Sequence, residues 1–119
     1  MARRVIIDTD PGTDDAIALF LALASPELEV ALVTVAGGNV GLARTLRNAR
    51  ALVALAGADI PVVAGADRPL LGRFTDAATV HGEDGLAGIA LPEGRTTSRS
   101  APISTAGCGW DSMPVAGLW

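Results

Sequence analysis

The amino-acid sequence predicts an α/β fold with an open, mostly parallel sheet that begins β-α-β-α-β. Short apolar runs at residues 4–8, 30–36 and 60–64 show no polar–apolar alternation, which is typical of strands covered on both faces. The segment 42–56 has the apolar period of an amphipathic helix. Because the connections between these segments are short, the strands are expected to run parallel with right-handed crossovers.

The first strand, at residues 4–8, is β-branched, and Pro11-Gly12 ends the extended segment that follows it. A helix is expected at 14–24, with Thr13 or Asp14 as its N-cap. This helix is apolar nearly all round, so we expect it to be well buried.

A second strand is expected at 30–36, followed by a turn at 37–39 and the amphipathic helix at 42–56. The third strand is expected at 60–64. Residues 65–94 are rich in Gly and Pro, and they predict a long functional loop or lid rather than more sheet.

Composition excludes several functional classes. The net charge of −4 and the lack of a basic run argue against a nucleic-acid partner. No uninterrupted apolar stretch reaches the roughly 18 residues that a membrane span needs. The single cysteine, Cys108, rules out an internal disulfide. A cytoplasmic protein of one domain, without a membrane partner, is therefore expected.

Four carboxylates lie within eight residues around the first strand–helix junction: Asp8, Asp10, Asp14 and Asp15. Like charges at this density repel each other unless a cation lies among them, and Ca²⁺ and Mg²⁺ prefer carboxylate oxygens. Because side chains alternate along a strand, Asp8 and Asp10 are expected to leave its carboxyl end on the same side. That end is where open α/β sheets bind ligands. The alternative is that these residues only cap the helix and form the turn.

Two other motifs are weaker. An EF-hand loop counted from Asp8 needs Gly sixth and Glu twelfth, but Thr13 and Leu19 stand there. A strand followed by Asp-x-Asp also resembles the nucleophile loop of haloacid dehalogenase-type Mg²⁺ phosphatases, with Asp8 as nucleophile and Asp10 as acid/base. The Pro-Gly turn and the doubled Asp14-Asp15 fit that pattern poorly. A non-catalytic remnant is the third possibility.

The run DTDPGTDDAIAL at residues 8–19 resembles the N-terminal signature of the inosine-uridine-preferring nucleoside hydrolases. The resemblance extends over about residues 3–94, with motifs in the family's order. These further motifs are Gly37-Gly38-Asn39-Val40, Arg47-Asn48-Ala49, Pro61-Val62 with Gly65 and Arg68-Pro69-Leu70, and His81-Gly82-Glu83-Asp84-Gly85-Leu86.

The resemblance implies that residues 1–94 are the N-terminal part of a nucleoside hydrolase domain, whose open Rossmann-like sheet is incomplete here. Residues 95–119 are dominated by Ser, Thr, Gly and Pro and show no helix or strand period. We expect an irregular, non-homologous or disordered tail there, produced by truncation or a shifted reading frame.

The family hydrolyses the N-glycosidic bond of ribonucleosides with a water molecule and Ca²⁺. The resemblance implies that Asp10 and Asp15 are metal ligands, with Asp10 also the general base, and that Asp8 supports the metal from the pocket floor. Asp14 is implied to accept a hydrogen bond from a ribose hydroxyl. Asn39 is implied to bind the sugar, although a turn residue in a left-handed conformation is the simpler alternative.

His81 is the only histidine and lies in the predicted loop. It could protonate the leaving base or approach the ribose, or it could be an ordinary loop residue. Asn48, on the second helix, is expected to be structural. The family's other catalytic and metal-binding groups come from the second half of its fold, so this chain alone is expected to be weakly active or inactive. Intact family members are expected to be homo-oligomers.

Overall fold

The computed structural model describes residues 1–71, 75, 77–91 and 115–117. The sheet has the strand order β3-β2-β1-β4, and each strand runs parallel to its neighbours. The predicted α/β fold with its β-α-β-α-β start is confirmed. In chain order the elements are β1 Arg3–Thr9, α1 Thr13–Ala24, β2 Leu28–Val35, α2 Leu42–Leu55, β3 Val62–Ala64, α3 Ala78–His81 and β4 Val115–Gly117.

Strand ends differ from the predicted ones because backbone pairing decides them. Arg3 pairs with Leu28 in the β1–β2 ladder, so both strands begin before their apolar runs. β3 begins only at Val62 because Pro61 has no N–H to donate, although its carbonyl still accepts from Val33 N at 3.0 Å. The short helix α3 lies within the segment predicted as a loop or lid.

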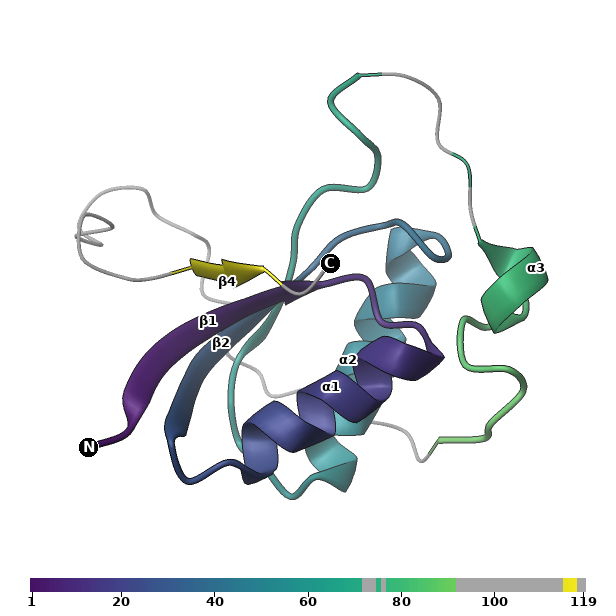
Figure 1. Ribbon diagram of the computed structural model, residues 1–119. Coiled ribbons are helices and arrows are strands. Elements are labelled where there is room, and N and C mark those ends of the chain that lie inside the picture. The colour runs from purple at the N-terminus through teal and green to yellow at the C-terminus, as the bar shows by residue number, and fades with distance from the viewer. Residues whose placement is uncertain (72–74, 76, 92–114, 118–119) are drawn as a thin grey trace.

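The core lies between the sheet and two helices on one of its faces. Figure 1 shows α1 and α2 side by side against β1 and β2. Their buried apolar side chains interlock with those of the strands, among them Val5, Ile7, Leu19, Val33 and Leu52. The carboxyl ends of β1 and β2 are therefore held in a fixed relation by the packed layer beneath them.

The expectation that α1 is well buried is wrong. Only Leu19 and Ala22 are buried on it, whereas Ile17 and Leu21 are 71% and 72% exposed. A helix can turn only one stripe toward a single sheet, and no described residue covers the opposite stripe of α1.

The last strand lies in the segment predicted to be irregular. Val115–Gly117 pairs in parallel with β1, from Ile6 to Asp8, along the edge of β1 that β2 leaves open. Sequence periodicity could not identify a three-residue strand that depends on a partner. The rest of the predicted tail, 95–114 and 118–119, lies outside the described residues. β1 thus stands between β2 and β4, where the strand order reverses.

Candidate functional site

Two polar segments meet at the carboxyl ends of β1 and β2. The ladder brings Thr9 beside Val35, and Ala36 N donates to Thr9 O at 3.0 Å. The segments that follow Thr9 and Val35 therefore lie close to each other. Asn39 N donates to Asp10 Oδ2 at 2.7 Å, and Asn39 Nδ2 donates to Asp10 O at 2.8 Å. This is the crevice at which an open α/β sheet binds ligands, next to the strand where the order reverses.

Asp15 enters the same group from the first turn of α1. Asn39 Nδ2 also donates to Asp15 Oδ2 at 3.2 Å, so Asn39 joins both carboxylates: its backbone N–H binds that of Asp10 and its side-chain amide binds that of Asp15. The same Asp15 oxygen accepts from Gly12 N at 2.9 Å. Gly12, rather than Thr13 or Asp14, is the N-cap, because the side chain of Asp15 satisfies its N–H from within the helix.

The electrostatics of this group disfavour its negative charge. Burial raises the pKa of the Asp10 carboxyl above its ordinary value; the N–H of Asn39 opposes the rise and the charge of Asp15 adds to it. The hydrogen bonds from Asn39 and Gly12 go to the Oδ2 atoms of Asp10 and Asp15. Two adjacent carboxylates suit a hard cation as part of a ligand set.

Gly38 makes room for this arrangement. A Cβ at residue 38 would overlap the Oδ2 atom of Asp10 outright. The carboxylate can accept from Asn39 N only because residue 38 has no side chain. The resemblance had singled out the segment containing Gly38 without giving that residue a role.

His81, at the end of α3, comes to the start of α1. Its Nδ1 lies 3.2 Å from Thr13 Oγ1, and Thr13 N donates to it at 3.5 Å. A Cβ on Gly12 would lie 3.0 Å from the imidazole ring and 2.8 Å from Asn39 Nδ2, so a larger residue would displace these side chains. Ala77 N donates to Asn39 O at 2.8 Å, which joins α3 to the acidic group. The structure thus brings His81, Asn39, Asp10 and Asp15 to one place.

Asp8 and Asp14 lie differently. The Asp8 carboxylate is exposed and accepts from Thr34 Oγ1 of β2 at 2.6 Å. Among the described residues, Asp8 is exposed and not enclosed in a pocket, and its support of a metal stays a prediction. Asp10 lies beyond the end of β1, where strand alternation no longer directs its side chain to the side of Asp8. Asp14 is exposed in the first turn of α1. Within the described part of the chain, no three His, Cys, Asp or Glu side chains converge on one point.

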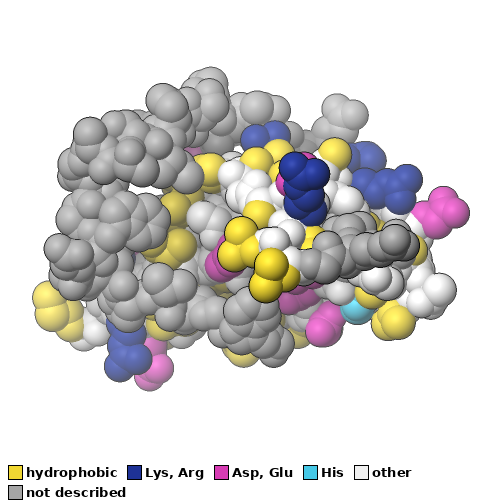
Figure 2. Space-filling model, turned by 90° about the horizontal axis from the view of Figure 1, so that it is seen from above, with side chains coloured by type: hydrophobic (Ala, Val, Ile, Leu, Met, Phe, Trp, Pro, Cys, Tyr) yellow, Lys and Arg dark blue, Asp and Glu magenta, His cyan; other side chains and the backbone are white. Residues whose placement is uncertain are grey.

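Figure 2 shows acidic side chains at the surface seen from above, with apolar side chains among them and a histidine close by.

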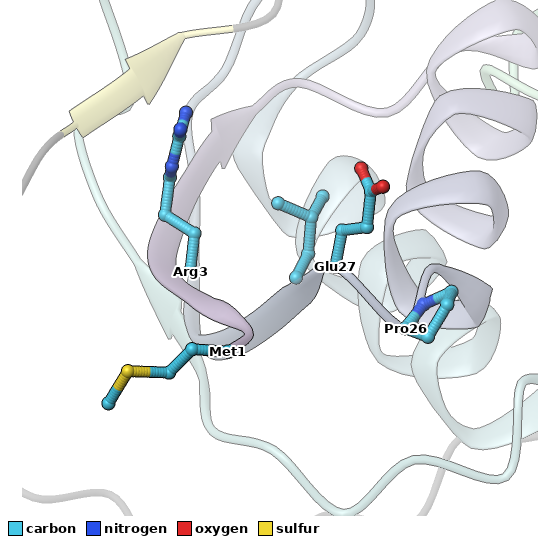
Figure 3. Close-up of a pocket in the computed structure, with 5 residues that line it drawn as sticks. Met1, Arg3, Pro26 and Glu27 are labelled. Carbon is cyan, nitrogen blue, oxygen red and sulfur yellow. The ribbon is translucent and has the colours of Figure 1, made fainter.

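A separate hollow of about 410 Å³ is lined by Met1, Arg3, Pro26, Glu27 and Leu28 (Figure 3). It lies at the amino ends of β1 and β2, opposite the acidic group. Among the described residues, no helix has the length and apolar character that a membrane span requires.

The loop after His81 folds around Asp84. Its carboxylate accepts from Leu86 N at 3.1 Å and from Gly88 N at 3.0 Å, and these two N–H groups lower the pKa of the Asp84 carboxyl. Because the pKa of Asp84 is lowered in the folded state, its carboxylate stabilises the fold at pH values above its ordinary pKa of 3.8. That contribution is lost as the pH falls through the lowered value.

Asp84→Asn is therefore expected to lower the melting temperature at pH 6, since a neutral amide oxygen accepts more weakly than a carboxylate. The difference between the variant and the natural chain is expected to shrink toward zero as the pH falls below 3.8. Thermal unfolding followed by circular dichroism measures it. A difference that stays constant from pH 6 to pH 2 would contradict this account of the loop.

The sequence was compared with known protein families. A family model described as inosine-uridine preferring nucleoside hydrolase matches residues 5–108. The chain belongs to this family. The match extends past residue 94, where the resemblance of the quoted motifs ends, and its last 17 residues, 92–108, lie outside the described part.

Similar nucleoside hydrolases are longer than this chain. The pyrimidine-specific ribonucleoside hydrolase RihA of Salmonella paratyphi B is 57% identical over 94 residues, which are 78% of this chain and 30% of that protein. The chain thus spans about 30% of the length of this relative.

Solved nucleoside hydrolases share the fold. The inosine-guanosine nucleoside hydrolase superposes with a TM-score of 0.73 at 42% identity, covering 80% of this chain and 29% of that one. The purine-preferring ribonucleoside hydrolase from Gardnerella vaginalis gives 0.72 at 31% identity, covering 78% and 31%. The fold, the family and the order of the motifs agree, which leaves the phosphatase alternative unsupported.

Proposed function

We propose that this chain carries the sugar- and water-binding part of a ribonucleoside hydrolase site that uses Ca²⁺. The observation that supports it is the joining of Asp10 and Asp15 through Asn39, with His81 beside them, at the ligand-binding edge of the sheet. The reaction breaks the N-glycosidic bond, adds the oxygen of water to the anomeric carbon and returns a proton to the base.

Asp10 and Asp15 would hold the ion through their carboxylate oxygens, of which Oδ2 of each accepts from Asn39. When bound, Ca²⁺ would supply positive charge that acidifies water and orients ribose hydroxyls. Because Ca²⁺ takes six to eight oxygens, these two side chains fit it as an incomplete ligand set. We therefore expect weak binding by this chain.

The protein groups divide the proton chemistry. Asp10 is the proposed general base, because a carboxylate beside the ion can take a proton from water that the ion has already acidified. Asp14, exposed at the start of α1, is proposed to accept from a ribose hydroxyl. The Nδ2 of Asn39 already donates to Asp10 and Asp15, so its Oδ1 is the atom proposed to accept from the sugar.

His81 is proposed to protonate the departing base. In its protonated form the ring is an imidazolium, whose Nδ1–H can donate to Thr13 Oγ1, 3.2 Å away, and whose Nε2–H would be given to the base, leaving a neutral ring. A proton passed from Nε2 to the base nitrogen as the bond breaks would be balanced by the one that Asp10 takes from water. His81 can then be reprotonated from Asp10 through solvent.

We expect this chain alone to be inactive or nearly so, because removing groups that act in the transition state commonly costs factors of about 10² or more. The test is incubation of the purified chain with inosine, uridine and p-nitrophenyl riboside, with and without Ca²⁺, followed by assay of ribose and base. RihA, assayed in parallel, provides the reference rate. Turnover near that reference would contradict the expected inactivity, and phosphate release from a phosphate ester with Mg²⁺ would favour the phosphatase alternative.

The described part is not expected to choose the base. The names of the relatives that share it specify pyrimidine, inosine–guanosine and purine nucleosides. Small-molecule ribonucleosides are therefore the proposed substrates, without a preference among them. Assembly into homo-oligomers and a cytoplasmic location stay predictions.

A further inference from the structure

We propose that Asn48 is a positioning residue, which holds the loop that carries His81 against the start of α1. Asn48 lies on α2 and is only 9% exposed. Its Nδ2 donates to Asp84 O at 2.7 Å. A buried amide without a hydrogen-bond partner lowers the stability of the fold. The bond from Asn48 to Asp84 O therefore also holds the loop in its place on α2.

The shape of the loop fits the helix at this point. Gly85 is buried with φ +83°, and a Cβ there would lie 3.2 Å from Asn48 Nδ2 and 3.0 Å from Val40 Cγ2. The backbone therefore lies directly on α2 without an intervening side chain. Leu86, which follows, is only 4% exposed.

Arg44 grips the loop one turn earlier on α2. Its guanidinium donates to Glu83 O, so two successive loop carbonyls are bound by two side chains of one helix. Residues at this spacing lie on the same face of a helix. The loop is thus clamped along a line rather than at a single point.

The clamp reaches His81 through the backbone. Ala87 N donates to His81 O at 2.7 Å, which ties the clamped turn to the end of α3. On the other side, Ala77 N donates to Asn39 O. The imidazole is held near Thr13 between these two attachments. The role of this position in protonating a leaving base rests on the proposed function. The contact of the loop with α2 does not depend on that function.

His81 is the only histidine, so its imidazole C–H signals in NMR report on this position alone. In the full chain, Asn48→Ala is expected to move these signals toward those of free histidine. It is also expected to speed hydrogen exchange at the Ala87 amide about tenfold, because the turn opens more often. Asn48→Asp keeps the shape but turns an oxygen toward Asp84 O, and the same changes are expected.

Thr45→Val is the matched control. Thr45 is fully buried on the same helix, and its Oγ1 donates to Ala36 O at 2.9 Å, away from the loop. This variant is expected to lower stability but to leave the His81 signals in place. A purely structural role for Asn48 would make the Asn48 and Thr45 variants behave alike.

A surface pair covers the case in which the Asn48 variants do not fold. Arg44→Ala is expected to shift the His81 signals in the same direction, whereas Arg47→Ala, at an exposed position on α2, leaves them unchanged. Folded variants at Asn48 and Arg44 with natural His81 signals would overturn the proposal. None of these readouts needs Ca²⁺ or turnover. If the variants shift the His81 signals but the protein has no link to nucleoside hydrolysis, the proposed function is wrong and the positioning role of Asn48 still holds.

Discussion

Asp10→Asn is expected to weaken Ca²⁺ binding by at least about 100-fold, since it removes one of the two charged ligands that the described residues contribute to the proposed site. Calorimetric titration of Ca²⁺ into the natural chain and the variant measures this. The position of Asp10 is fixed by Asn39 N, and an amide oxygen can still accept that bond, so the local fold should survive.

Without Ca²⁺, Asp10→Asn is expected to maintain or raise the stability of the chain. The pKa of Asp10 is raised in the folded state, so its negative charge lowers stability once the pH exceeds the unfolded value of 3.8. At pH 7 without Ca²⁺ the variant should melt at or above the temperature of the natural chain. Added Ca²⁺ should raise the melting temperature of the natural chain only.

Asp8→Asn is the matched control for Asp10→Asn. Asp8 is exposed and accepts from Thr34, outside the group formed by Asp10 and Asp15. Its neutralisation is expected to change Ca²⁺ affinity less than about threefold, as for a screened surface charge. A larger loss from Asp8→Asn than from Asp10→Asn would show that the ion lies elsewhere.

Gly38→Ala is expected to displace the Asp10 carboxylate, because the added methyl would occupy the place of Asp10 Oδ2. The cost to stability is expected to be about 1–3 kcal/mol, as for other overpacked sites. Ca²⁺ affinity should fall about tenfold or more as Asp10 loses its contact with Asn39 N. Chemical denaturation and calorimetric titration measure the two effects.

Gly41→Ala tests whether the effect of Gly38→Ala is specific to the contact between residue 38 and Asp10. Gly41 is the N-cap of α2 with φ −60°, and a Cβ there meets nothing within 4 Å. Its replacement should change stability by less than about 1 kcal/mol and leave Ca²⁺ affinity unchanged. If Gly38→Ala behaved like Gly41→Ala, the packing of Asp10 against residue 38 would be wrong.

Local pattern was enough to predict the first five elements, from β1 to β3, and their order. The β-branched run before Asp8 and the apolar stripe of α2 encode a strand and a helix by themselves, and Pro11-Gly12 and Gly37-Gly38 mark the turns between them. Asn39 was placed in the site by the family resemblance, and the common edge at which parallel strands end accounts for its contact with Asp10.

What the sequence missed depends on three-dimensional neighbours. The exposure of Ile17 follows from which stripe of α1 meets the sheet, and periodicity cannot show that in a helix that is apolar all round. The different hydrogen-bond partners of Asp8 and Asp10, Thr34 and Asn39, depend on the strand pairing and the turn that follows it. The bond from Asn48 to Asp84 O joins residues 36 apart, and only the folded loop reveals it.

Diffraction from crystals of this chain grown with CaCl₂ tests the central claim most directly. We expect one calcium peak in the anomalous map, within about 2.3–2.6 Å of oxygens from both Asp10 and Asp15. A calcium peak bound elsewhere, or Asp10 and Asp15 bare while Ca²⁺ saturates the crystal, would contradict it.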